Sequence, residues 1–239
     1  MIAKLIDRPR ENSLTAAVVG HLLHLPSEDF WQILRTACPS PNFPKDPGEP
    51  IRIHAWPSWN ADGTRNSERV IPDLVIEFHA FDLIIEAKRW DRPMQDSEQW
   101  KDQLKAYINE YGVEKRQVKM IALGGIHSNQ DEPIEDVWRT DNMSIPDEHI
   151  FICPVYMCRW SSVLLACQRR KREIEQGDRS SRTLADTRIL NDLIDLFIHH
   201  GFPPLRWFED FDFSLNLLTE RADADREFFR NASQRFRQI

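Results

Sequence analysis

Two runs rich in β-forming residues follow each other with only His79 and Ala80 between them, and this arrangement constrains the fold more than any other feature of the sequence. The first run spans 70–78 and the second spans 81–88. An antiparallel hairpin centred on these two residues places Asp73 opposite Glu86. Because side chains alternate between the faces of a strand, one face of this hairpin is wholly apolar and the other is charged. The apolar face holds Leu74, Ile76, Phe78, Leu83, Ile85 and Ala87, and the charged face holds Asp73, Glu77, Asp82, Glu86 and Lys88.

Apolar residues at helical spacing, and shorter β-rich runs, predict the elements around this hairpin. The predicted helices span 11–25, 27–37 with Ser27 as the N-cap, 97–111 with Gly112 as the C-cap, 161–176 and 183–200. The predicted strands span 51–56, 118–123 and 150–156. Residues 39–50 hold five prolines and a glycine, which excludes a helix or a central strand there. A helical crossover between Lys88 and Val118 joins parallel neighbours, so we expect an α/β fold with a mixed sheet flanked by helices.

Charge and hydropathy narrow the classes of function. The chain has 31 Lys and Arg against 38 Asp and Glu, a formal net charge of −7, so its overall field does not attract nucleic acid. A polyanion must then be met by a local basic patch or through metal ions. No apolar stretch approaches the ~18 residues of a membrane span. Charged residues at 7, 8 and 10 interrupt the stretch that a signal peptide would need, so we expect a cytoplasmic protein without a membrane partner.

The length of the chain predicts one core with additions. We assign residues 1–160 to this core, including the N-terminal helices, and 161–239 to a helical C-terminal decoration rather than an independent domain. The cysteines at 38, 153, 158 and 167 form no C-x-x-C pair, and three of them lie in apolar surroundings. We therefore expect reduced, structural thiols.

The opposed carboxylates of Asp73 and Glu86 indicate a bound cation. Directly opposed residues on one face of a hairpin have Cβ atoms about 4.5–5.5 Å apart, which lets two carboxylates share one ion. Without a cation the two charges would repel, and a hard divalent ion suits oxygen ligands, so we expect Mg²⁺ with Mn²⁺ as a substitute. Lys88 projects from the same face, where its ammonium can orient a metal-bound water and offset charge that develops on a phosphate.

Pro72-Asp73, followed after twelve residues by Glu86-Ala87-Lys88, resembles the motif of the PD-(D/E)XK nuclease superfamily. The likeness extends to Glu11 on the first predicted helix. It also includes Gln103 and Tyr107, which match the Gln-x-x-x-Tyr of RecB-like members on the helix after the lysine strand. These two residues are four apart and so share one face of that helix. The resemblance covers roughly residues 11–123.

This resemblance implies a restriction-endonuclease-like core of order αβββαβ with extra C-terminal helices. It implies Mg²⁺-dependent hydrolysis of phosphodiester bonds in DNA, with endonuclease favoured over exonuclease, in a setting such as restriction, phage defence or repair. The implied metal ligands are Glu11, Asp73, Glu86 and the carbonyl of Ala87. The implied catalytic residues are Asp73, Glu86, Lys88, Gln103 and Tyr107. A second copy of the chain, or a separate motor or sensor subunit, is a candidate partner besides DNA.

Other interpretations stay open. The main alternative is a non-catalytic DNA-binding or assembly subunit with a nuclease-like fold, and another is a charged sheet face in an unrelated α/β protein. Tyr107 also fits a core aromatic with a satisfied hydroxyl, and Gln103 fits a surface residue. Glu11 also fits a charge that is favourable near the start of a helix.

Two further features each have two interpretations. Trp56 and Trp59 fit either stacking on bases or packing on the hairpin. The basic run 169–172 fits either phosphate contacts or a solvated helix end. Gly124-Gly125 lacks the following Lys-Ser/Thr of a phosphate loop, so we interpret it as the geometry of a strand end.

Overall fold

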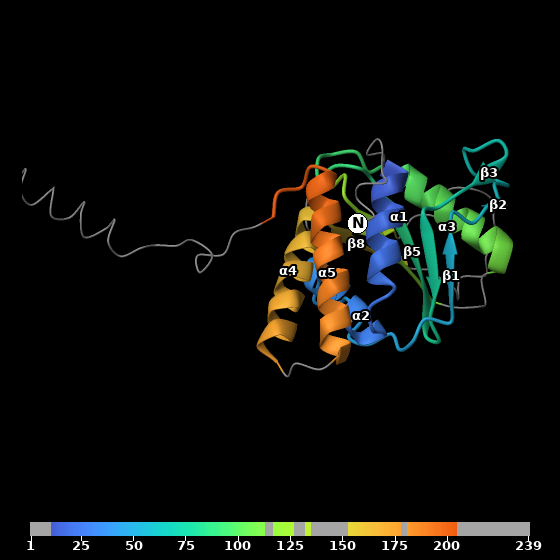
Figure 1. Cartoon of the computed structure of the whole chain (residues 1–239). Helices are drawn as coiled ribbons and strands as arrows, with labels where there is room; N and C mark the ends of the chain where they lie inside the picture. The colour runs from blue at the N-terminus through green and yellow to red at the C-terminus, as the bar shows by residue number, and fades with distance from the viewer. Residues whose placement is uncertain (1–10, 113–116, 127–131, 135–152, 178–180, 205–239) are drawn as a thin grey trace, which may run out of the picture. The chain divides into compact units, whose positions relative to one another are not determined.

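The computed structural model describes residues 11–112, 117–126, 132–134, 153–177 and 181–204, with the side chains of 11, 12, 132–134, 181 and 182 left outside (Figure 1). Within these ranges the helices are α1 (Glu11–Leu22), α2 (Ser27–Ala37), α3 (Ser97–Tyr111), α4 (Trp160–Gln176) and α5 (Ser181–His199). The strands are β1 (Arg52–Ala55), β2 (Trp59–Asn60), β3 (Arg69–Val70), β4 (Leu74–Glu77), β5 (Phe81–Ala87), β6 (Gln117–Leu123), β7 (Glu132–Ile134) and β8 (Cys153–Cys158).

The main sheet mixes antiparallel and parallel pairs. Its order is β1-β4-β5-β6-β8-β7, and β2 and β3 pair as a separate ribbon. β1, β4 and β5 are antiparallel neighbours, whereas β5, β6 and β8 run parallel, and β7 is antiparallel to β8. The predicted mixed sheet flanked by helices is therefore confirmed, with α3 as the crossover between the parallel strands β5 and β6.

The β4–β5 hairpin has the register expected from the sequence. Leu74 pairs with Ile85, and at the turn the amide of Phe78 donates to the carbonyl oxygen of Phe81 over 2.9 Å. The prediction of one strand over 70–78 is wrong in its extent, because Val70 belongs to β3 and β4 begins only at Leu74. Pro72 lies in this gap and has no N–H to donate to a ladder, which gives a physical reason for the break.

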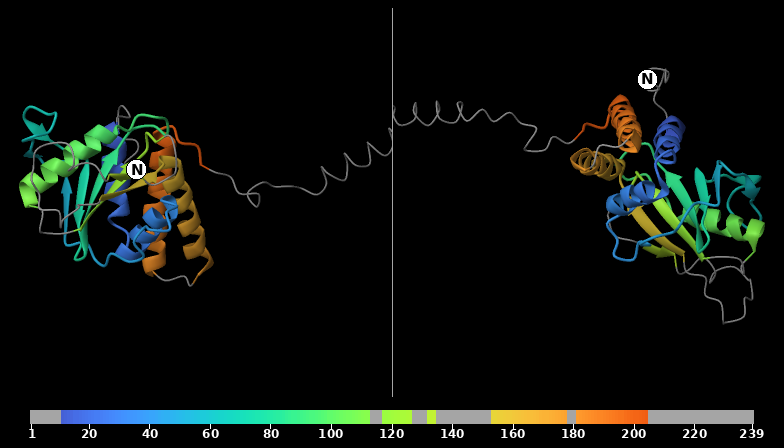
Figure 2. Two further views of the ribbon diagram at one scale, coloured as in Figure 1. Left: turned by 180° about the vertical axis from the view of Figure 1, so that it is seen from behind. Right: turned by 60° about the horizontal axis from the view of Figure 1, so that its bottom comes forward.

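Each face of the sheet is covered by its own hydrophobic core. On one face Leu74, Ile76 and Leu83 pack with buried residues of α1, α2, α4 and α5. On the other face Val75 and Ile84 pack with α3. The views in Figure 2 show the sheet between these two layers of helices. The hairpin face that the sequence marks as charged is thus the face that α3 covers.

The structure of α3 agrees with the predicted helix over 97–111 at both ends. The N-cap is Asp96, whose carboxylate accepts the amide of Glu98 over 3.0 Å, and Gly112 follows the last turn with a φ of 82°. At α2 the prediction of Ser27 as the N-cap is wrong. Pro26 occupies the N-cap position, and Ser27 is the first residue of the helix.

The C-terminal helices share a core with the rest of the sheet. Leu193 and Phe197 of α5, and Val163 of α4, are buried in the same cluster as α1 and α2. The compact unit that contains them extends to Pro204, and the second unit begins at Leu205, outside the described residues. None of the described helices is long and apolar enough to cross a membrane.

Gly124 and Gly125, which follow β6, pack against the loop that follows β5. Both have positive φ values, 67° and 61°. A Cβ on Gly124 would lie 2.4 Å from the carbonyl oxygen of Lys88, and one on Gly125 would lie 2.7 Å from the Lys88 Cβ. The Gly125 carbonyl accepts the amides of Met94 and Gln95, each over 2.8 Å. This strand end therefore brings two backbone segments into close approach beside Lys88.

Replacing Gly124 by Ala should lower the free energy of unfolding by about 3 kcal/mol or more. A left-handed backbone costs an L-residue roughly 1–2 kcal/mol, and here the new Cβ also collides with a backbone oxygen that cannot move aside. The matched control is Gly112→Ala, where φ is also positive but nothing lies within 4 Å of the added Cβ. Urea unfolding followed by circular dichroism measures both, and equal losses would contradict the close-approach argument.

The cysteines should be inert in the native protein. All four are buried and none of them forms a disulfide, as the sequence predicted. Burial raises the pKa of Cys167 to about 12, and burial also raises the pKa of Cys153, so neither provides a thiolate near neutral pH. We expect no reaction with a thiol-specific disulfide reagent at pH 8, and reaction of all four thiols in guanidinium chloride. Rapid labelling of the native protein would refute this expectation.

Candidate active site

Polar side chains line the contact between β5 and α3, and we call this contact the β5–α3 seam. Alternate residues of β5 point toward α3, and every fourth residue of α3 points toward β5. Contacts along the seam pair the first turn of α3 with the end of β5 and later turns with its beginning. The seam consists of Asp82, Glu86 and Lys88 on the strand side and Gln99, Gln103 and Tyr107 on the helix side.

Glu86 is the most heavily bonded carboxylate of the seam. It is 3% exposed, and a buried charge is costly unless it is paired and hydrogen-bonded. Its Oε1 accepts from Lys88 Nζ and from Gln99 Nε2, each over 2.7 Å. Its Oε2 accepts from Gln103 Nε2 over 2.5 Å. The sequence prediction that Gln103 points back at the site is therefore supported by a direct contact.

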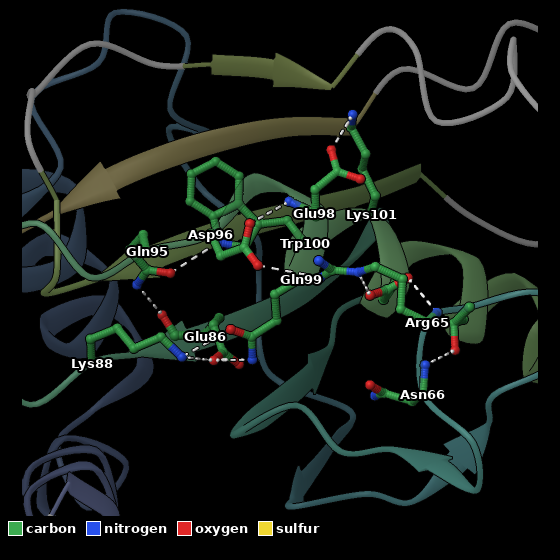
Figure 3. A network of polar contacts seen from close by, with 12 residues as sticks. Arg65, Asn66, Glu86, Lys88, Gln95, Asp96, Glu98, Gln99, Trp100 and Lys101 are labelled. Atoms are coloured by element: carbon green, nitrogen blue, oxygen red, sulfur yellow. Dashed lines mark hydrogen bonds and ion pairs between the residues drawn. The ribbon is translucent and has the colours of Figure 1, made fainter.

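Lys88, Gln99 and Glu86 are each hydrogen-bonded to the other two, as Figure 3 shows. Besides its bond to Glu86, the Lys88 Nζ donates to Gln99 Oε1 over 3.0 Å. The Lys88 side chain is only 15% exposed, and its carbonyl oxygen accepts from the indole of Trp160 over 2.6 Å. Gln99 was not among the residues expected from the sequence. Its only signal is its place four residues before Gln103, on the same face of the helix.

Asp73 lies at the end of the hairpin ladder, next to the peptide bond between Glu86 and Ala87. Its Oδ2 accepts the amide of Ala87 over 2.8 Å. This carboxylate thus takes the position of a backbone acceptor one step beyond the last ladder pair, Leu74 with Ile85. By the alternation of the strand Asp73 is on the face of Val75, the face that α3 covers and to which Glu86 also belongs. The structure therefore places the Asp73 carboxylate against the backbone of Ala87, which lies between Glu86 and Lys88 in the sequence.

Tyr107 contacts a different carboxylate from the one that Gln103 contacts. Its hydroxyl donates to Asp82 Oδ2 over 2.5 Å, and both residues are buried. Its ring packs in a group with Trp59 and Tyr111. The described contacts of Tyr107 thus fit a core aromatic with a satisfied hydroxyl. Tyr107 lies one turn of α3 after Gln103, the residue that contacts Glu86.

Gln95 ties the ends of two strands to the start of α3 and was also not anticipated. Its Nε2 donates to the carbonyl oxygens of Glu86 and Gly124, each over 3.1 Å. Its Oε1 accepts from the indole of Trp100 over 2.9 Å. Figure 3 shows this side chain beside Glu86 and Lys88. Gln95 lies outside any helix or strand, so no periodic pattern could have marked it.

The β2–β3 ribbon is fixed against α3. The Arg65 Nε donates to Asp102 Oδ2 over 2.7 Å, and its backbone amide donates to the other oxygen of the same carboxylate over 3.1 Å. The hydrogen bond with Asp102 raises the pKa of Arg65. Trp59, 1% exposed, belongs to the core that α3 covers. Packing, rather than base stacking, therefore accounts for Trp59.

The donor set fits a magnesium site of low protein coordination. Within the described residues no group of three or more His, Cys, Asp or Glu side chains could hold a metal ion. Mg²⁺, however, is usually bound by one or two carboxylates and keeps several waters. Asp73 and Glu86 supply two carboxylates, and Asp73 contacts the backbone of Ala87, the residue that follows Glu86.

An unpaired atom of Gln103 supports the same fit. Its Oε1 is buried and has no hydrogen-bond partner, which is rare for a buried polar atom. A metal-bound water would donate to it. Exchanging the nitrogen and oxygen of this amide would not supply the missing hydrogen bond, because the oxygen would then face Glu86 Oε2. Glu11 begins α1, but its side chain lies outside the described residues, so its expected role as a ligand stays a prediction.

The basic run 169–172 takes part in ion pairs within the chain. Arg170 donates to Asp29 on α2 over 2.5 Å and to Glu173 over 2.9 Å. Lys171 lies 3.6 Å from Glu175. Arg170 thereby joins α4 to α2, a structural role that the sequence did not predict for this run.

Replacing Tyr107 by Phe should lower the free energy of unfolding by about 1–3 kcal/mol, because the buried carboxylate of Asp82 loses a donor. Tyr111→Phe is the matched control, since Tyr111 belongs to the same aromatic group but is only partly buried. Urea unfolding of the two variants and the wild type gives the comparison. A smaller loss in Tyr107→Phe than in Tyr111→Phe would show that the bond to Asp82 contributes nothing.

No family model, no curated protein and no solved structure matches this chain. The likeness to the PD-(D/E)XK superfamily therefore rests on the residues themselves. They are Asp73, the Glu86-Ala87-Lys88 triplet and the helix that carries Gln103.

Proposed function

We propose that this protein is a Mg²⁺-dependent nuclease that hydrolyses phosphodiester bonds in DNA. The observation that carries the proposal is the buried Glu86 carboxylate, bonded by Lys88, Gln99 and Gln103 beside Asp73. A stable fold has no need of a charged pair at this depth, since apolar residues of similar volume would serve as well. A strand end that concentrates carboxylates, a lysine and amides is instead suited to metal and phosphate chemistry.

The order of the elements supports a restriction-endonuclease-like core. Helix α1 precedes three antiparallel strands, β1, β4 and β5, and α3 then crosses to the parallel strand β6. Apart from α2, which lies between α1 and β1, this is the αβββαβ order that the resemblance implies. The β2–β3 ribbon is inserted between β1 and β4, and β7, β8, α4 and α5 follow the core.

Asp73, Glu86 and the carbonyl of Ala87 are the proposed metal ligands, with Glu11 as a candidate for a further one. Both lone-pair directions of Glu86 Oε1 are used by Lys88 and Gln99, so Oε2 is the oxygen with room for a cation. When bound, Mg²⁺ lowers the pKa of a coordinated water and stabilises negative charge on a phosphate oxygen.

Lys88 supplies a local positive charge in a chain whose net charge is negative. Its ammonium is held by Glu86 Oε1 and Gln99 Oε1 and is largely shielded from solvent. In such surroundings an ammonium stabilises a developing phosphate charge more strongly than it would in water. Gln99 also accepts a hydrogen bond from the ammonium, and Gln103 holds the other oxygen of Glu86. Because the net charge is −7, this local cation and the metal are what would meet a polyanion.

The test is cleavage of supercoiled, linear and single-stranded DNA by the pure protein in Mg²⁺, with EDTA as the blank. Lys88→Ala should lower the rate by roughly 100-fold or more, the size typical of losing one charge-stabilising group. The matched control is Lys101→Ala, because Lys101 lies on α3 in an exposed pair with Glu98 and such pairs contribute little. The control should cut within about twofold of the wild type, since it leaves every seam contact in place.

Two other outcomes have definite meanings. If no substrate is cut but Mg²⁺ binds and Asp73→Asn abolishes the binding, the metal site stands and cutting requires a partner or an activator. If Mg²⁺ does not bind at all, the metal site is discarded and a non-catalytic DNA-binding or assembly subunit takes the place of the enzyme.

A further inference from the structure

Trp56 has a backbone conformation that, within the described residues, is otherwise confined to glycine. Its φ is 49°, in the left-handed region that bulky residues avoid because Cβ comes too close to a carbonyl oxygen. Trp56 directly follows β1, which ends at Ala55. A conformation of this kind persists only where the surrounding contacts stabilise it, and such residues gather at functional sites.

The contacts that stabilise Trp56 both go to Asp73. The backbone amide of Trp56 donates to the Asp73 carbonyl oxygen over 3.0 Å, which extends the β1–β4 pairing by one residue. Its indole Nε1 donates to Asp73 Oδ1 over 3.2 Å. Backbone and side chain of one tryptophan thus hold the backbone and side chain of one aspartate.

The Asp73 carboxylate is thereby held from two neighbouring strands. The Oδ1 atom is held by Trp56 at the end of β1, and Oδ2 by the amide of Ala87 in β5. β4 lies between these two strands in the sheet. With a donor held against each of its oxygens, the carboxylate keeps its orientation.

Packing does not explain Trp56. Its side chain is 38% exposed, and it belongs to neither hydrophobic core. Trp59, three residues later, is 1% exposed and lies in the core under α3. The packing of a buried tryptophan can offset the free-energy cost of a strained backbone. An exposed tryptophan packs less, so its strained backbone needs another explanation.

We propose that Trp56 is a positioning residue that orients the Asp73 carboxylate for Mg²⁺. This inference rests on the proposed function, because it assumes that Asp73 is a metal ligand. A ligand that is already oriented loses less freedom when the ion binds, so the affinity for the ion rises. Trp56 touches neither the metal nor the phosphate in this role, and it acts only through Asp73.

Trp56→Phe isolates the indole N–H, since it keeps an aromatic ring and the strained backbone. Titration calorimetry with Mg²⁺ alone should show binding roughly 10- to 100-fold weaker than in the wild type, the loss typical of removing a hydrogen-bond partner of a metal ligand. Ile53→Ala is the matched control, because Ile53 is an exposed residue of β1, the strand that Trp56 follows. It should bind Mg²⁺ as the wild type does.

Trp56→Gly separates positioning from stability. Glycine adopts a φ of 49° without strain, so the urea midpoint should be unchanged or higher while Mg²⁺ affinity falls as in Trp56→Phe. A purely structural side chain would do the reverse, lowering the midpoint and leaving the affinity of the folded protein unchanged.

Asp73→Asn, which should abolish binding, distinguishes this inference from the proposed function. If Asp73→Asn abolishes Mg²⁺ binding but both Trp56 variants bind like the wild type, only the role of Trp56 is overturned. If the wild type does not bind Mg²⁺, the metal site and the role of Trp56 both fall.

Discussion

One buried carboxylate, that of Glu86, determines how the elements around it pack. Glu86 sits inside a strand whose every residue is buried, where an unpaired charge would cost several kcal/mol. Three donors surround it, one from Lys88 and two from the amides of Gln99 and Gln103. These donors come from two elements, so the carboxylate can be accommodated only when α3 lies across β5 in one particular position. The compensation of the Glu86 charge therefore depends on the path of the chain from β5 through α3.

The sheet explains why α3 is available there. β5 has an antiparallel neighbour on one side and a parallel neighbour on the other. A parallel pair needs a long connection that passes over the sheet, and here that connection is α3. The same helix thus satisfies the topology, buries Val75 and Ile84 beneath it, and brings its polar residues to the strand. Moving the parallel pairing to another strand would remove both the cover and the donors of Glu86.

Local periodicity decides which parts of this arrangement could be predicted from the sequence. The hairpin register follows from pairing the two β-rich runs about His79 and Ala80, and the direction of Gln103 follows from its place on a helix that returns over the strand. Trp56 could not be found in this way, because no sequence pattern marks a tryptophan with a positive φ. Gln99 looks like an ordinary residue in the first turn of a helix. The β2–β3 ribbon was missed because its strands are two residues each, too short to show any period.

The backbone just after β5 is also joined to the C-terminal helices. The indole of Trp160, the first residue of α4, donates to the carbonyl oxygen of Lys88. A few residues further on, the Asp91 carboxylate accepts the amides of Trp160 and Ser161, each over 2.8 Å. These bonds connect the start of α4 to the segment that carries the ammonium. A displacement of the start of α4 would therefore also move the Lys88 backbone, so the position of the Lys88 ammonium depends on where this helix begins.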